Sequence, residues 1–158
     1  MATVTLVSER TFNRPAEDVY DFVSNPANWV KTYPGSTHEE GLPSNKALKV
    51  GDTWTETGPS GDHYSWSVSM TNRPTLWVCE TTGRLAHDGT GKGGVEGRIE
   101  IRYRFMRPGN NVTIFQRTYI TETYPGTPPL ADIFYTSQNP KHAEVYFDGI
   151  ARELAKKG

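Results

Sequence analysis

The sequence predicts an α+β domain in which a curved antiparallel sheet of seven strands packs against one long C-terminal helix. Residues 36–124 alternate polar and apolar side chains with a period of two, broken by turn residues, which is typical of an antiparallel meander. Residues 143–154 carry an apolar stripe at helical spacing. The chain has 158 residues, 35% of them hydrophobic, so we expect one domain spanning residues 1–158.

The first elements are a strand followed by two short helices. Residues 3–11 mix Val, Leu and Thr as strands do. Pro15 then opens a segment whose apolar residues, such as Val19 and Val23, recur at helical spacing. A second helix is expected directly afterwards, because Asn25 suits an N-cap and Pro26 suits the first helical position. This helix ends at Pro34 and Gly35.

Six more strands complete the predicted sheet. They are expected at residues 37–41, 51–57, 63–72, 76–85, 95–107 and 111–123. Arg73 and Pro74 turn one hairpin, and residues 108–110 turn another. The alternation is clearest in 95–105, where Val95, Gly97, Ile99, Ile101, Tyr103 and Phe105 share one face and charged residues occupy the other.

The last element covers the apolar face of the sheet. Asn139 and Pro140 form another pair of N-cap and first-turn residues, so this helix is expected from Pro140 to about Lys156. Its apolar residues are Ala143, Tyr146, Phe147, Ile150, Ala151 and Leu154. A looser turn is expected at residues 130–135.

Composition excludes several classes of function. A formal net charge of -1 does not favour nucleic-acid binding. The single Cys79 and the absence of a secretory-type apolar run indicate a reducing, cytoplasmic location, and no stretch reaches the roughly 20 apolar residues of a membrane helix. The four histidines lack close metal-ligand spacing, and the glycine-rich segment 89–94 lacks Walker spacing. We expect no metal and no cofactor.

The segment RPAEDVYDFVSNPANWVKTYPG, together with the order of elements, resembles the polyketide cyclase and dehydrase branch of the START-like (SRPBCC) superfamily. The resemblance spans nearly the whole chain and is carried by residues such as Pro15, Glu17, Asn25, Pro26 and Trp29. It implies a helix-grip fold with an apolar cavity. The superfamily contains cyclases, lyases and hydrolases but also lipid carriers and receptors, so the resemblance locates a fold and not a reaction.

The function expected from this resemblance is cofactor-independent proton transfer on a hydrophobic aromatic or polyketide-like substrate, giving cyclisation, dehydration or related lyase or hydrolase chemistry. The alternative is a non-catalytic carrier of a lipid or aromatic metabolite. An interaction module with a solidly filled core is a third class. Whether two copies of the chain pair is left open.

Three residues are candidates for the chemistry. Glu80 is the first choice for the base, because a carboxyl group buried in an apolar cavity has a raised pKa. His142, in the first turn of the last helix, is placed to shuttle protons at the cavity mouth. Tyr103 is a candidate hydrogen-bond donor to an enolate. The alternatives are a Glu80 paired with Arg84, a solvent-exposed His142 and a tyrosine in the core.

Strand alternation also predicts which side chains contact the substrate. These candidates are Trp54, Glu56, Tyr64, Trp66, Gln116, Thr118, Tyr135 and Tyr146. The assignment of Glu80 depends on Leu76 and Val78 facing inward. Trp77, Cys79 and Thr81 offer the opposite inward face of the same strand, and a one-residue bulge would reverse any of these assignments.

Overall fold

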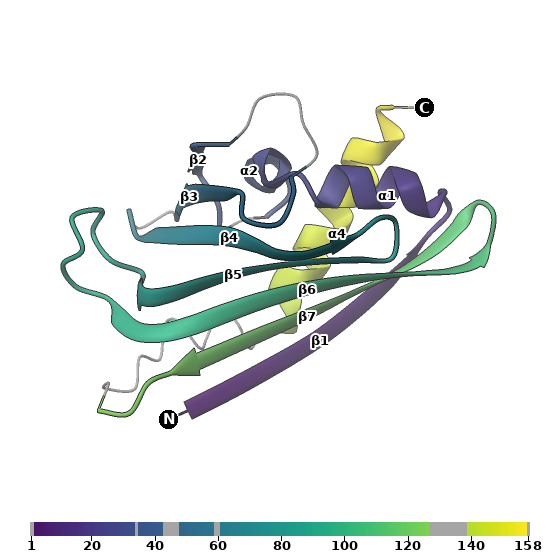
Figure 1. Ribbon diagram of the computed structural model, residues 1–158. Helices are drawn as coiled ribbons and strands as arrows, with labels where there is room; N and C mark the ends of the chain where they lie inside the picture. The colour runs from purple at the N-terminus through teal and green to yellow at the C-terminus, as the bar shows by residue number, and fades with distance from the viewer. Residues whose placement is uncertain (1, 34, 43–47, 59–60, 127–138, 158) are drawn as a thin grey trace.

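The computed structural model describes residues 2–33, 35–42, 48–58, 61–126 and 139–157. Within these residues seven strands form one antiparallel sheet in the order β1-β7-β6-β5-β4-β3-β2 (Figure 1). The strands are β1 Ala2–Phe12, β2 His38–Glu40, β3 Thr53–Thr57, β4 His63–Asn72, β5 Leu76–Leu85, β6 Val95–Gly109 and β7 Val112–Thr123. The predicted α+β fold class is therefore confirmed.

The helices begin where their capping residues predict. The two short helices after β1 comprise α1 (Ala16–Val23) and a continuous pair, η1 (Pro26–Asn28) and α2 (Trp29–Thr32). The Asn25 side chain accepts a hydrogen bond from the Ala27 N–H, as an N-cap should. The long helix α4 (Pro140–Ala155) is capped in the same way, by Asn139 accepting from the Lys141 N–H. The turn expected at residues 130–135 lies outside the described residues.

The sheet curves around α4, and α1 and α2 lie beside α4, above β4 in the view of Figure 1. Helix α4 buries most of its predicted stripe, with Phe147 and Ile150 fully inaccessible to solvent, but Ala151 is exposed. Helix α2 packs closely on α4 at Gly149, where an added Cβ would lie 2.9 Å from the Thr32 Cα. A glycine at this position lets the two backbones meet. No helix among these described residues combines the length and the apolar character that a bilayer span requires.

Strand β6 has the inner face that its alternation predicts, since Val95, Ile99, Ile101, Tyr103 and Phe105 are all buried. Register then fixes the faces of its neighbours, because residues directly opposite one another share a face. On β5, Trp77 pairs with Tyr103 and Cys79 pairs with Ile101. The face of Trp77, Cys79 and Thr81 is therefore the inner one, and the expected inward orientation of Glu80 is wrong.

The predicted inner face of β7 is wrong for the same reason. Arg117 lies opposite Tyr103, and Tyr119 lies opposite Ile101. Gln116 and Thr118 consequently point to the outer face, and the Gln116 amide donates a hydrogen bond to Glu9 of β1. On β4, Trp66 and Val68 face inward as predicted. A bulge after Val68 turns Met70 outward, where it is 48% exposed.

The outer face of the sheet carries a network of ion pairs that accounts for Glu80. Arg98 lies 3.2 Å from Glu80 and 2.6 Å from Glu100, and Arg102 lies 3.1 Å from Glu100. The network confirms the predicted charged outer face of β6, although Glu100 at its centre is only 8% exposed. The prediction treated Leu76 and Val78 as inward because they are apolar. Val78 is in fact buried on the outer side of the sheet, where its cross-strand partners are Met70 and Arg102.

Candidate active site

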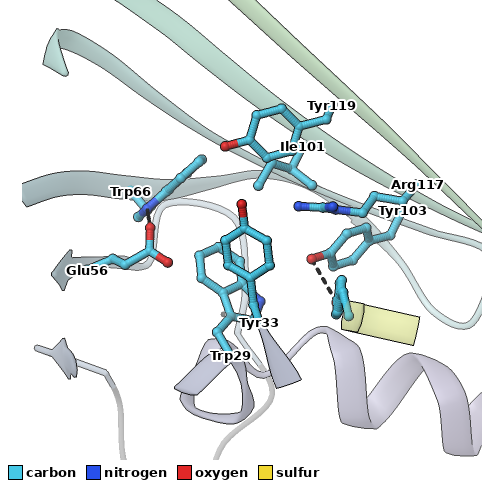
Figure 2. A pocket seen from close by; sticks show the side chains of 9 residues that line it. Trp29, Tyr33, Glu56, Trp66, Ile101, Tyr103, Arg117 and Tyr119 are labelled. Atoms are coloured by element: carbon cyan, nitrogen blue, oxygen red, sulfur yellow. Dashed lines mark hydrogen bonds between the residues drawn. The ribbon is translucent and has the colours of Figure 1, made fainter. Parts of the chain in front are cut away.

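A cavity lies between the inner face of the sheet, α2 and α4 (Figure 2). Its walls are formed by Trp29, Tyr33, Glu56, Trp66, Ile101, Tyr103, Arg117, Tyr119 and Tyr146. The cavity volume is about 10 Å³, and the empty space amounts to about 260 Å³ when the side open to solvent is included. The cavity as it stands has room for about one water molecule.

Tyr33 occupies the centre of this space. It directly follows the last residue of α2, and Figure 2 shows its ring standing between Glu56 and Arg117. An added Cβ on Gly35 would lie 2.5 Å from the Tyr33 ring, so the glycine leaves room for the ring in this position. Because the ring fills much of this space, a ligand larger than water fits only if side chains such as Tyr33 move.

Glu56 is the acidic group on the cavity wall. It lies on β3, is only 5% exposed, and accepts hydrogen bonds from the Trp66 indole N–H at 3.0 Å and from the Ser36 hydroxyl. Burial raises the pKa of Glu56 from 4.5 to about 7, although the two hydrogen bonds act in the opposite direction. Near neutral pH this carboxyl is therefore poised to take up or release a proton.

Glu39 lies directly opposite Glu56 on the neighbouring strand β2. Both of its carboxyl oxygens are buried, and neither has a hydrogen-bond partner among the described residues. Burial, followed by the charge of Glu56, raises the pKa of Glu39 to about 9. Glu39 is therefore protonated near neutral pH, which leaves Glu56 as the member of the pair that titrates there.

Arg117 projects from β7 into the other side of the cavity (Figure 2). Its guanidinium carbon lies 4.8 Å from the centre of the Tyr119 ring, 4.9 Å from that of Tyr146 and 5.3 Å from that of Tyr33. Burial disfavours the charge, but the surrounding tyrosines more than offset it and the pKa of Arg117 stays above its usual value. The cavity therefore has a permanent positive charge opposite the Glu56 carboxyl.

Two tyrosines complete the polar wall. The Tyr146 hydroxyl of α4 donates to the Tyr103 hydroxyl of β6 at 3.0 Å. Burial raises the pKa of Tyr146 to about 12 and that of Tyr103 well above 10, so both remain protonated. Tyr103 then keeps a hydroxyl proton that it can donate to a ligand oxygen.

Comparison with solved structures identifies the fold. Norcoclaurine synthase from Thalictrum flavum, solved with dopamine and hydroxybenzaldehyde, superposes with a TM-score of 0.68 at 13% identity, covering 99% of this chain and 89% of that chain. A START superfamily protein from Mycobacterium smegmatis gives 0.69 at 11% identity, covering 98% and 99%. Ara h 8.0201 gives 0.67 at 13% identity, covering 98% and 99%.

The chain has a START-like helix-grip fold. No protein-family model matches the chain, and no curated protein matches it in sequence. Because these three structures are only 11% to 13% identical to the chain, they identify the START-like fold alone. The branch of polyketide cyclases and dehydrases stays a prediction.

The START-like fold brings together four of the residues selected from the sequence. Tyr103, Glu56, Trp66 and Tyr146 all line the cavity. Trp54 and Tyr64 lie on the same inner face but pack against Trp66, with ring centres 6.3 and 6.4 Å from it, and do not line the cavity.

The other predicted residues lie elsewhere. Glu80, Gln116 and Thr118 are on the outer face of the sheet, away from the cavity. His142 is half-buried in the first turn of α4 and is not among the described residues of the cavity wall. Tyr135 lies outside the described residues.

Sequence reasoning missed Arg117, the positively charged residue among the described cavity walls. The predicted inward orientation of Gln116 and Thr118 implied that Arg117, which lies between them, points to the outer face. The bulky rings of Phe115 and Tyr119 on either side of Arg117 were the signal that could have corrected this. Both share a face with Arg117, and Phe115 is fully buried.

Proposed function

We propose that the protein is an enzyme that moves a proton on a small hydrophobic molecule with a ring, bound between the sheet and α4. The observation that carries the proposal is Glu56, a buried carboxyl on the cavity wall whose pKa is raised to about 7. A base with a pKa near the working pH is what general acid–base catalysis requires. Glu56 takes the role that the sequence assigned to Glu80.

The aromatic walls suit a planar, conjugated substrate. Trp29 and Trp66 meet edge to face with ring centres 5.5 Å apart, and both line the cavity. Such rings supply apolar contact area together with a polar edge. A ring of the substrate in contact with them would place its reactive carbon near Glu56.

The proposed step is deprotonation next to a carbonyl group. Glu56 takes the proton through a lone pair not used by Ser36 or Trp66, the C–H electron pair forms the enolate C=C bond, and the carbonyl oxygen gains the negative charge. Protonated Glu56 then returns the proton to carbon or to a departing hydroxyl group, which leaves as water. In a cyclisation the enolate carbon first attacks a second carbonyl carbon of the substrate, and the alkoxide oxygen formed there receives the proton. This sequence covers isomerisation, aldol-type cyclisation and dehydration without a cofactor.

Deuterium exchange tests the step without knowledge of the natural substrate. The protein is incubated in D₂O with 2-tetralone or phenylacetone, and loss of the proton signal next to the carbonyl is followed by NMR. We expect exchange that increases with pH through about 7, as Glu56 loses its proton. Glu56→Gln should slow it by about 10² to 10⁴-fold.

Glu80→Gln is the matched control, because it removes one carboxylate from the outer face and leaves the cavity intact. Its exchange rate should equal that of the wild-type protein. Equal rates in wild type and Glu56→Gln would refute the role of Glu56. Tight binding of these ketones with no exchange above the buffer rate would favour a carrier instead.

A further inference from the structure

Arg117 differs from the arginines on the outer face of the sheet. Arg98 and Arg102 are partly exposed, and each lies within 3.2 Å of a glutamate oxygen. Arg117 is 5% exposed, and no carboxylate in the described part of the chain forms an ion pair with it. Its Nε has no hydrogen-bond partner among those residues. The most deeply buried of these three arginines is thus the one without a counter-ion in the described part of the chain.

The surroundings of Arg117 stabilise a positive charge but do not neutralise it. Tyr33, Tyr119 and Tyr146 place the faces of their rings toward the guanidinium group, which supplies cation–π attraction. Glu56, the acidic residue among the described cavity walls, is held by Ser36 and Trp66 and forms no ion pair with Arg117. A buried charge in this state gains from any anion that enters the cavity.

The geometry of the guanidinium group restricts which anion it prefers. Its N–H groups form a planar fork that matches a planar oxyanion, and its central carbon lies over the rings of Tyr119 and Tyr146. Figure 2 shows the guanidinium group pointing into the cavity, so the fork is the part that meets a ligand. The neighbouring Tyr103 hydroxyl can donate a further hydrogen bond to the same oxyanion.

We propose that Arg117 binds a planar oxyanion carried by the ligand, and that the substrates of this cavity are ring compounds bearing a carboxylate or forming a conjugated enolate or phenolate. This inference deepens the proposed function. It rests on that proposal in one respect, that the cavity is where the ligand binds. Arg117 holds the oxygen end of the substrate, and Glu56 exchanges a proton at the other end.

Binding of matched pairs of probes tests the inference. Benzoate is compared with benzyl alcohol, and 4-nitrophenolate with 4-nitroanisole, by titration calorimetry and by quenching of tryptophan fluorescence, since Trp29 and Trp66 line the cavity. We expect at least one of the two anions, benzoate or 4-nitrophenolate, to bind at least tenfold more tightly than its neutral partner. A preference for benzoate alone identifies a carboxylate ligand, and one for 4-nitrophenolate alone identifies an enolate-like ligand.

Variants connect the preference to Arg117. Arg117→Met should abolish the preference for anions while the neutral probes still bind. Arg104→Met, which removes an exposed arginine of β6, should leave the preference unchanged. Arg117→Lys keeps the charge but loses the planar fork, so benzoate affinity should fall at least threefold. This variant provides the test if Arg117→Met does not fold. No preference for either anion, a preference that survives Arg117→Met, or unchanged benzoate affinity in Arg117→Lys would overturn the inference.

The two proposals fail in different ways. Anion binding that depends on Arg117, without deuterium exchange, would refute the role of Glu56 and leave the ligand class intact. Exchange that depends on Glu56, without any preference for anions, would refute the ligand class and leave the proton transfer intact.

Discussion

Replacing Glu56 by glutamine should change how the stability of the fold depends on pH, and this can be measured without any substrate. The carboxyl of Glu56 has a pKa of about 7 in the folded chain against 4.5 as its ordinary value. Its proton therefore stabilises the folded state fully below about pH 4.5, and that stabilisation is lost as the pH rises through 7. At about 1.36 kcal/mol per pKa unit, the loss amounts to about 3 kcal/mol.

Glutamine has no proton to lose, and its amide can still meet the Trp66 indole and the Ser36 hydroxyl. The free energy of unfolding of Glu56→Gln minus that of wild type should therefore rise by about 3 kcal/mol between pH 4.5 and pH 8. Urea unfolding at a series of pH values, followed by tryptophan fluorescence, gives this difference, with Glu80→Gln as the control for loss of one outer carboxylate. Parallel curves for Glu56→Gln and wild type would show that burial does not raise the pKa of Glu56, and the proposed base would fall with it.

Two further predictions concern the neighbours of the site. Trp66→Phe removes the indole N–H that donates to Glu56 at 3.0 Å and favours the charged form of the carboxyl. The midpoint of the pH dependence of deuterium exchange should therefore move to higher pH, and an unchanged or lower midpoint would contradict this. Gly149→Ala adds a methyl group 2.9 Å from the Thr32 Cα. Overpacking should outweigh the better helix propensity of alanine and lower the free energy of unfolding, measured in urea, by about 1 kcal/mol. An increase would mean that α2 moves freely away from α4.

The local elements of this fold could be predicted because their signals are local. The caps at Asn25 and Asn139 use side chains within two residues of the amides that they serve. The inner face of β6 was also predicted correctly, since five of its odd-numbered residues are large and buried while the even-numbered ones from Glu96 to Arg104 are charged.

Faces were predicted wrongly wherever both sides of a strand carry apolar residues. On β5, Val78 is 2% exposed although it lies on the outer face, so alternation alone favoured the wrong side and carried Glu80 inward. On β4 the bulge after Val68 shifted the pattern by one residue. A shift of one residue reverses every side chain beyond it, and only the hydrogen-bonded register decides which face is inside.

By itself the sequence determined the order of elements, the seven strands, the capped helices and the stripe on α4, because these depend on side-chain spacing along a few turns or a single strand. Only the tertiary structure decided that Glu56 and Arg117, 61 positions apart in the printed sequence, face one cavity. That pairing depends on the register of β7 against β6 and of β3 against β4, and on burial that changes the proton affinity of one carboxyl. Neither quantity exists until the sheet has closed over α4.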